Sequence, residues 1–289
     1  MLVTRIRVSK VLSSAGVSNA GLWSAMNAEE IPSKPTLHPA FLEALQALWR
    51  KAGACASDTS LPPEKLRVLD LGCGDGRLAL SLVEEAVTWG VGVDWIGTDV
   101  CGNAIQSARR LAHNAGYLPV DAVPPAQSPL SASEQQRRAR PRMSFLVGDA
   151  TSVDITQNVG FFDVVLCQLV ISVVGSLQQR QACLKTAFRH LRPGGVLLLS
   201  SSGASEDVNS QYKELYDADL AITGEFRTYL SRSATGSVLY VTHHFSADEI
   251  ADLLTQTGFT DITTHEALET SSRRPDEAAR FLYTICVRR

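Results

Sequence analysis

A glycine-rich turn between a short apolar run and a helix-like segment constrains the fold of this chain more than any other feature. The apolar run covers residues 66–71, and the turn from Asp70 to Gly76 has the sequence Asp-Leu-Gly-Cys-Gly-Asp-Gly. Leu78, Leu82 and Val83 then recur at helical spacing. Glycines let the backbone turn sharply and let a ligand approach the main chain, where the first N–H groups of the helix are exposed. The sequence therefore predicts a strand, turn and helix that bind a ligand.

Strand-like and helix-like segments alternate along most of the chain. Apolar runs typical of strands cover residues 66–71, 91–98, 144–147, 163–169, 196–200, 260–264 and 281–287. Helical patterns cover residues 39–53, 104–115, 178–191 and 246–258. The last of these helices opens with a capping box formed by Ser246 and Glu249. This order predicts an α/β fold with a mostly parallel seven-stranded sheet, helices on both faces and a C-terminal antiparallel edge hairpin.

We expect two parts in the chain. Residues 1–60 form an N-terminal helical lid or extension, and residues 61–289 form the main domain. Within it, residues 118–142 lack periodicity and are rich in Pro, Ser, Gln and Arg, which predicts a mobile surface insertion. Its arginines, at positions 137, 138, 140 and 142, are expected to be solvated. Residues 203–245 are longer than a simple loop and hold four of the six tyrosines, so we expect them to form a cap over the substrate.

Composition narrows the class of protein. The formal net charge of −3 gives no general attraction to nucleic acid, and no apolar stretch is long enough to span a bilayer, so neither partner is expected. The six cysteines show no Cys-x-x-Cys pairing, which indicates free thiols and no metal site. We expect a cytoplasmic protein. Since residues 1–28 contain basic residues and serines but no acidic residue, a mitochondrial transit peptide is the alternative to a lid. No oligomeric state is predicted.

The residues around the turn indicate which nucleoside it binds. Asp99 ends the next strand, where a carboxylate can accept hydrogen bonds from both hydroxyls of a ribose. A dinucleotide fingerprint requires Gly-x-Gly-x-x-Gly, but Arg77 stands where its last glycine belongs. Asp70 would oppose a pyrophosphate and suits a cationic ligand. These features disfavour NAD.

At these motifs the chain resembles the class I S-adenosylmethionine-dependent methyltransferases. The resemblance covers residues 66–200 in motif order, and it includes Phe162 to Val165 as the entry to the fourth strand and Leu191 to Gly195 as the turn before the fifth. It implies a Rossmann-like sheet and S-adenosyl-L-methionine as the methyl donor. In this family the turn surrounds the methionine portion, the acid after the second strand binds ribose, and an acidic and a small residue after the third strand flank adenine.

Carried over to this sequence, the resemblance implies a set of donor-binding residues. They are Asp70, Gly72, Cys73, Gly74, Gly76, Asp99, Val100, Asp149, Ala150 and Gln168. Gln168 stands where the family often has a polar residue that faces the substrate. Two alternatives stay open: Asp149 can cap a turn instead of contacting adenine, and Asp163 can be structural. Cys73 is expected to pack beside the donor and not to act as a nucleophile.

Methyl transfer from a sulfonium is an in-line displacement, so the protein mainly aligns the reactants and excludes water. A hydroxyl or protonated amine acceptor also needs a general base. Tyr240, His243 and His244 at the end of the cap are our candidates. The two histidines point to opposite sides if the run 238–245 is extended, so at most one can face the acceptor. His38 and Trp23, from the lid, are weaker candidates.

Three functions compete. The first is a methyltransferase for an O, N or S atom of a small molecule. The second is a methyltransferase for protein or RNA that docks its substrate on the arginine-rich insertion. The third is a non-catalytic or NAD-binding relative that keeps the fold. Residues 166–168, Leu-Cys-Gln, contain neither the Asn/Asp-Pro-Pro-aromatic motif of base amino methylation nor the proline before a nucleophilic cysteine.

Overall fold

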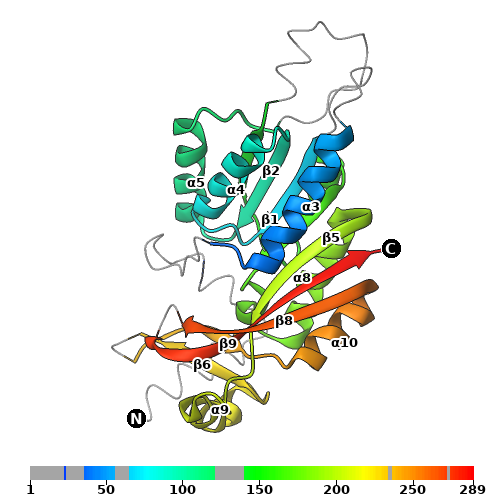
Figure 1. The fold of residues 1–289 in the computed structure, drawn as a ribbon. Coiled ribbons are helices and arrows are strands. Elements are labelled where there is room, and N and C mark those ends of the chain that lie inside the picture. The colour runs from blue at the N-terminus through cyan, green and yellow to red at the C-terminus, as the bar shows by residue number, and fades with distance from the viewer. Residues whose placement is uncertain (1–22, 24–35, 56–64, 121–139, 234–235, 272–273) are drawn as a thin grey trace, which may run out of the picture.

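A seven-stranded sheet with the strand order β3-β2-β1-β4-β5-β9-β8 runs through the molecule (Figure 1). The structure is a computed structural model, and it describes residues 23, 36–55, 65–120, 140–233, 236–271 and 274–289. Strands β3, β2, β1, β4 and β5 are parallel, and β9 is antiparallel to both β5 and β8. The strands are β1 (Leu66–Leu71), β2 (Val93–Asp99), β3 (Arg142–Val147), β4 (Phe162–Gln168), β5 (Leu191–Ser202), β8 (Phe259–Ser271) and β9 (Arg274–Arg288). The predicted sheet and its C-terminal edge hairpin are confirmed.

Helices cover both faces of this sheet. One face packs against α3 (Pro39–Cys55), α4 (Arg77–Thr88) and α5 (Gly102–Asn114), and the other against α7 (Thr156–Val159), α8 (Leu177–His190) and α10 (Ala247–Thr257). Because successive strand residues point to opposite faces, Val68 belongs to the first core and Leu69 to the second. We call the side that carries α3, α4 and α5 the first face. None of the helices in the described ranges is long and apolar enough to cross a membrane.

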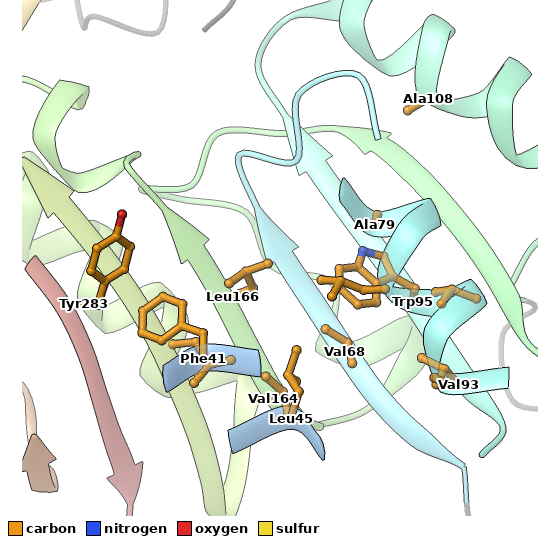
Figure 2. Close-up of a cluster of buried hydrophobic side chains, with 14 of the residues drawn as sticks. Phe41, Leu45, Val68, Ala79, Val93, Trp95, Ala108, Val164, Leu166 and Tyr283 are labelled. Carbon is orange, nitrogen blue, oxygen red and sulfur yellow. The ribbon is translucent and has the colours of Figure 1, made fainter. Parts of the chain in front are cut away.

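Helix α3 is part of the core of the first face. Phe41 and Leu45 are buried, and Figure 2 shows them over the strands that carry Val68 and Leu166, with Tyr283 beside Phe41. The rings of Phe41 and Tyr283 meet edge to face at 5.5 Å. The other residues of the predicted lid, apart from Trp23 and residues 36–38, lie outside the described part of the chain.

The start of β3 corrects our view of the arginine-rich insertion. The strand begins at Arg142, two residues earlier than predicted, and Arg142 donates to Asp94 through Nε at 3.1 Å and Nη2 at 2.7 Å. Lys65 donates to the same carboxylate at 3.0 Å. Although burial opposes ionisation of Asp94, these hydrogen bonds hold its pKa below the ordinary value. Arg142 is therefore a structural residue and not a solvated one; residues 121–139 lie outside the described ranges.

The segment 203–245, which we call the cap segment, attaches to the carboxyl end of β5. It contains α9 (Ser210–Thr223) and an antiparallel hairpin of β6 (Thr228–Arg232) and β7 (Val238–His243). Beyond β7, Phe245 donates to the carbonyl of Ser202 at 2.9 Å and accepts from Ala204 at 2.7 Å. In Figure 1 the long β8–β9 hairpin reaches past the end of β5 toward α9 and β6. The cap segment thus lies at the edge of the sheet where the parallel strands end.

Candidate active site

In the glycine turn between β1 and α4, the main chain borders space that no atom of the described residues fills. Gly72 has φ 78°, and its N–H and that of Cys73 donate to the carbonyl of Thr98 at 2.7 and 3.0 Å. A Cβ atom at Gly72 would lie 2.1 Å from Val170 Cγ2, so no larger residue fits. At Gly74, whose φ is 54°, no atom lies within 4 Å of the place a Cβ would take. A ligand can therefore approach the main chain at Gly74.

Two carboxylates lie at the ends of neighbouring strands beside this turn. Asp70 is 3% exposed, and burial together with the charge of Asp99 raises the pKa of Asp70 to about 7. Asp99 accepts from the N–H of Gly74 at 3.0 Å and from that of Cys101 at 2.8 Å. Burial raises the pKa of Asp99, and these hydrogen bonds partly offset that effect. A buried pair of like charges favours a cationic ligand, because a cation lowers the electrostatic cost of ionising both groups.

Cys73 has the surroundings of a packing residue. Its sulfur lies so close to Gly97 that a Cβ atom there would approach it to 2.7 Å. Burial and the charges of Asp70 and Asp99 raise the pKa of Cys73 well above its ordinary value. The side chain is therefore a neutral thiol, and a thiol is a poor nucleophile.

The end of β3 is joined to the end of β2, because the N–H of Gly148 donates to the carbonyl of Asp99 at 3.0 Å. The next residue, Asp149, accepts from the N–H and the hydroxyl of Thr151, both at 2.8 Å, so it caps its own turn. Ala150 is buried beside it and Val100 is half-buried. Asp149 thus caps the turn that follows β3, one residue beyond the hydrogen bond to Asp99.

Asp163 lies at the opposite, amino end of β4. It accepts from the N–H of Arg67 at 2.6 Å and pairs with Arg192 at 2.7 Å. These contacts join β1, β4 and the turn before β5. Of the two readings we left open for Asp163, the structural one therefore fits its position.

A row of side chains lies along the carboxyl edge of the sheet on the first face. Register aligns Gln168 with Ser200, and Ser200 with Tyr283. Adjacent strands lie about 4.8 Å apart, so Gln168 and Tyr283 are separated by about 10 Å across Ser200. The side chains that precede this row by two residues, Val68, Leu166 and Leu198, all belong to the first core, and so does Tyr283. Asp70, Gln168, Ser200 and Tyr283 therefore share one face.

Gln168 has an unsatisfied oxygen in this row. Its Oε1 is buried and has no hydrogen-bond partner among the described residues. The next residue, Leu169, has φ 61°, a left-handed conformation that costs a non-glycine residue about 1 to 2 kcal/mol. Its N–H donates to the carbonyl of Ser200 at 3.1 Å and to the hydroxyl at 3.0 Å, which holds the strained backbone in place. Strain and an unpaired polar atom at one place are typical of functional sites.

His243 points to the face of the sheet that carries α8 and α10, and it belongs to an ionic network. Its Nδ1 lies 2.7 Å from the hydroxyl of Thr228, and its Nε2 lies 3.0 Å from Glu249. The carboxylate of Glu249 therefore contacts His243 and does not complete the capping box that we expected with Ser246. Half of that box is present, because the hydroxyl of Ser246 accepts from the N–H of Glu249. Glu225 completes the network, pairs with the buried Arg180 and lies 4.0 Å from His243.

This network is the one group of side chains in the described ranges with the spacing of metal ligands. The ligand atoms of Glu225, His243 and Glu249 lie within 4.8 Å of one another. The two glutamates face different nitrogens of the imidazole, and the guanidinium of Arg180 already supplies a positive charge. The geometry is that of an ion network that fastens the cap segment to α8 and α10.

His244 points to the first face, among tyrosines of the cap segment. Its Nδ1 lies 2.7 Å from the hydroxyl of Tyr216 and its Nε2 3.3 Å from that of Tyr229. Tyr212 also contacts the ring, with centroids 4.9 Å apart. Tyr240 lies on the same side of β7 as His244 and stacks on Trp23 at 4.5 Å.

His38 lies near the other end of the row. Its ring stacks on Tyr283 at 3.9 Å, and the hydroxyl of Tyr283 donates to Glu269 at 2.6 Å. Neither Tyr283 nor Glu269 was among our candidates, because no motif marks them. The alternation of side chains along β9 and β8 could have indicated which face these two residues occupy. It does so only when the pairing of β9 with β5 is known.

Comparisons with known proteins agree with this architecture. A family model described as a methyltransferase domain matches residues 41–264. A solved S-adenosylmethionine-dependent methyltransferase from Methanosarcina mazei is 24% identical, with a TM-score of 0.58 over 78% of this chain and 93% of that one. A structure solved for the conversion of a disulfide bond into a thioacetal group during echinomycin biosynthesis is 20% identical, with a TM-score of 0.50 over 99% and 93%. No curated protein sequence matches the chain.

Proposed function

This chain belongs to the class I S-adenosylmethionine-dependent methyltransferases, and from that premise we propose that it methylates a small-molecule acceptor held between the sheet edge and the cap segment. S-adenosylmethionine is its methyl donor. The observation that carries the small-molecule proposal is the burial of the acceptor side: Tyr216, His244 and Tyr283 are each at most 3% exposed. Such a site suits an acceptor that is enclosed, not a surface that docks a macromolecule.

The residues around the turn fit the donor. The open space at Gly74 allows close approach of the methionine portion, and Asp70 offers a negative charge to its ammonium group. We propose that Asp99 binds the ribose hydroxyls, and that Val100, Asp149 and Ala150 line the adenine site. Gly72, Cys73 and Gly76 shape the turn.

The bound donor supplies a methyl group on a sulfonium, which an acceptor takes by in-line displacement. The protein contributes alignment and a proton acceptor. Gln168 lies on the same face of the sheet as Asp70, two residues beyond Leu166, the register partner of Asp70, and it offers Oε1 to the acceptor. We propose His244 as the general base, because its side of β7 is the first face, with Tyr240 as the alternative. His243 is committed to the ionic network and becomes a structural residue in this proposal.

The arginine-rich insertion gives little support to a macromolecular acceptor. Arg142 pairs with Asp94 and is not available to bind phosphate or an acidic peptide. The other arginines of the insertion, apart from Arg140, lie outside the described ranges.

The test is incubation of the pure protein with methyl-labelled donor and a cell extract separated into small molecules, protein and RNA. We expect label in the small-molecule fraction, and strongly reduced label with the Asp99→Ala variant at a donor concentration near the parental Kd. Label confined to protein or RNA would contradict the small-molecule proposal while leaving the methyltransferase activity intact.

A further inference from the structure

Glu206, four residues beyond β5, holds a buried carboxylate oxygen without a partner. Its Oε1 accepts from both Nε and Nη2 of Arg227, at 2.8 and 2.6 Å. Its Oε2 is buried and has no hydrogen-bond partner among the described residues. Withdrawing an ionised oxygen from water without a donor is costly, so the arrangement is incomplete as it stands.

Arg227 is held in place and does not serve the second oxygen. Its φ is 59°, a left-handed conformation, and its carbonyl accepts from the N–H of His244 at 3.0 Å. Both of its donor atoms that contact Glu206 go to the same oxygen, Oε1. The strained backbone of Arg227 thus couples the position of Glu206 to that of His244, and it leaves Oε2 for another donor.

A cluster of aromatic rings lies beside this carboxylate. The pKa of Tyr216 is raised by burial and then by the charge of Glu206, so the two side chains lie close together. The ring centroids of Tyr216 and Tyr229 are 6.0 Å apart, and those of Tyr212 and Tyr216 are 6.4 Å apart. A carboxylate beside aromatic faces is the chemistry that binds organic cations.

The group lies on the donor side of the sheet. Tyr212, Tyr216 and Tyr229 belong to the same core as Tyr283, which lies in the row along the carboxyl edge, and Leu166, which precedes Gln168 on the same face. The unpaired oxygen of Glu206 therefore lies beyond the end of β5 on the face where the acceptor is expected.

We propose that the acceptor is a basic amine and that Glu206 recognises it as the ammonium ion through Oε2. This inference rests on the proposed function and names the substrate class of that same site. In the reaction, His244 takes one proton from the ammonium group. The freed nitrogen lone pair forms the new N–C bond, the electrons of the C–S bond pass to sulfur, and the products are a methylated ammonium ion and the neutral thioether S-adenosylhomocysteine. Glu206 determines specificity, because a neutral or anionic acceptor would leave its buried Oε2 without a partner.

The experiment identifies the labelled product and then measures its kinetics in matched variants. The parent protein is incubated with labelled donor and a small-molecule extract, and the product is identified by mass spectrometry. We expect methyl transfer to the nitrogen of a basic amine. A product methylated on oxygen or sulfur, or on a molecule without a basic nitrogen, overturns the inference but leaves the proposed function standing. Label only in macromolecules overturns both.

The variants then test Glu206 itself. Glu206→Gln keeps an oxygen for Arg227 but removes the charge, so we expect the KM of the amine to rise about 10- to 100-fold, the scale of a hydrogen bond to a charged group, with unchanged donor affinity. Glu206→Asp should recover part of the loss. Glu214→Gln, an exposed position on α9, is the matched control and should behave as the parent. An unchanged KM in a Glu206→Gln protein that binds donor normally would contradict the role of Glu206.

Discussion

The hydroxyl of Tyr216 lies 2.7 Å from Nδ1 of His244, on the face opposite to the one that His243 occupies. Two adjacent histidines at the end of β7 therefore enter different environments. His244 contacts tyrosine hydroxyls near the acceptor side, whereas His243 contacts Thr228 and Glu249. Variants of His244 and His243 can therefore distinguish the proposed base from the structural residue.

Removal of His244 should slow the methyl-transfer step. We expect His244→Ala to lower the single-turnover rate by about 10² to 10⁴-fold, the usual contribution of a general base, with little change in donor affinity. Tyr240→Phe keeps the ring that stacks on Trp23 and should retain the parental rate. If the Tyr240 variant loses rate and the His244 variant does not, the base is the tyrosine hydroxyl.

Removal of His243 should weaken the fold and not the chemistry. His243→Ala leaves Glu249 and Thr228 without their imidazole partner, so we expect the free energy of unfolding to fall by about 1 to 3 kcal/mol. Urea denaturation measures this, with the exposed His113→Ala as control. A variant of parental stability that has lost methyl transfer would place His243 in the chemistry.

Donor affinity should depend on pH through Asp70. Its pKa is raised to about 7, so below that pH the carboxyl group is neutral and cannot attract the ammonium group of the donor. Affinity should therefore rise from pH 5.5 to 7 by about tenfold per pH unit and level off above it. Calorimetric titration across this range tests the expectation. Asp70→Asn should bind weakly and without this pH dependence; a variant that keeps the slope would assign it to another group.

Shortening of the insertion should spare both fold and activity. The carbonyl of Leu118 accepts from the N–H of Met143 at 2.9 Å, so the chain leaves and re-enters the sheet at neighbouring points. Replacement of residues 122–138 by a short Gly/Ser linker closes a smaller loop at little entropic cost. We expect parental thermal stability and parental turnover of the small acceptor. A folded variant without turnover would place the insertion in the acceptor site.

The fold was predictable where local pattern decides it. Apolar runs located all seven strands of the main sheet but not β6 of the cap segment, and the predicted ranges were too short for the last hairpin: residues 260–264 became Phe259–Ser271. The additional residues include His265 and Glu266, which are exposed at the edge of the sheet and lack the apolar alternation of a half-buried strand. Arg142 was misjudged because its partner Asp94 lies 48 positions away in the chain.

The same distinction between local pattern and long-range contact decides which residues of the candidate site could be predicted. The proximity of Asp70 and Asp99 could be predicted, because Asp70 is the next-to-last residue of β1 before a recognisable turn and Asp99 ends the neighbouring strand β2. Tyr283 and Glu206 could not, because they belong to no motif. Tyr283 joins the row only through the pairing of β9 with β5, and Glu206 only through Arg227 across the cap segment. Contacts between distant segments carry this information, and residue type alone does not.

The most direct test of a donor site built on Asp70, Gly74 and Asp99 is calorimetric titration of S-adenosylmethionine into the parent protein and Asp99→Ala. Asp99 accepts from the Gly74 N–H at 3.0 Å, and we expect it to accept from the ribose hydroxyls as well. Its loss should therefore weaken donor binding by about 1.5 to 3 kcal/mol, the scale of hydrogen bonds to a charged group. NAD should not bind the parent measurably. Unchanged donor affinity in a folded Asp99→Ala variant, or tight binding of NAD by the parent, would contradict the account.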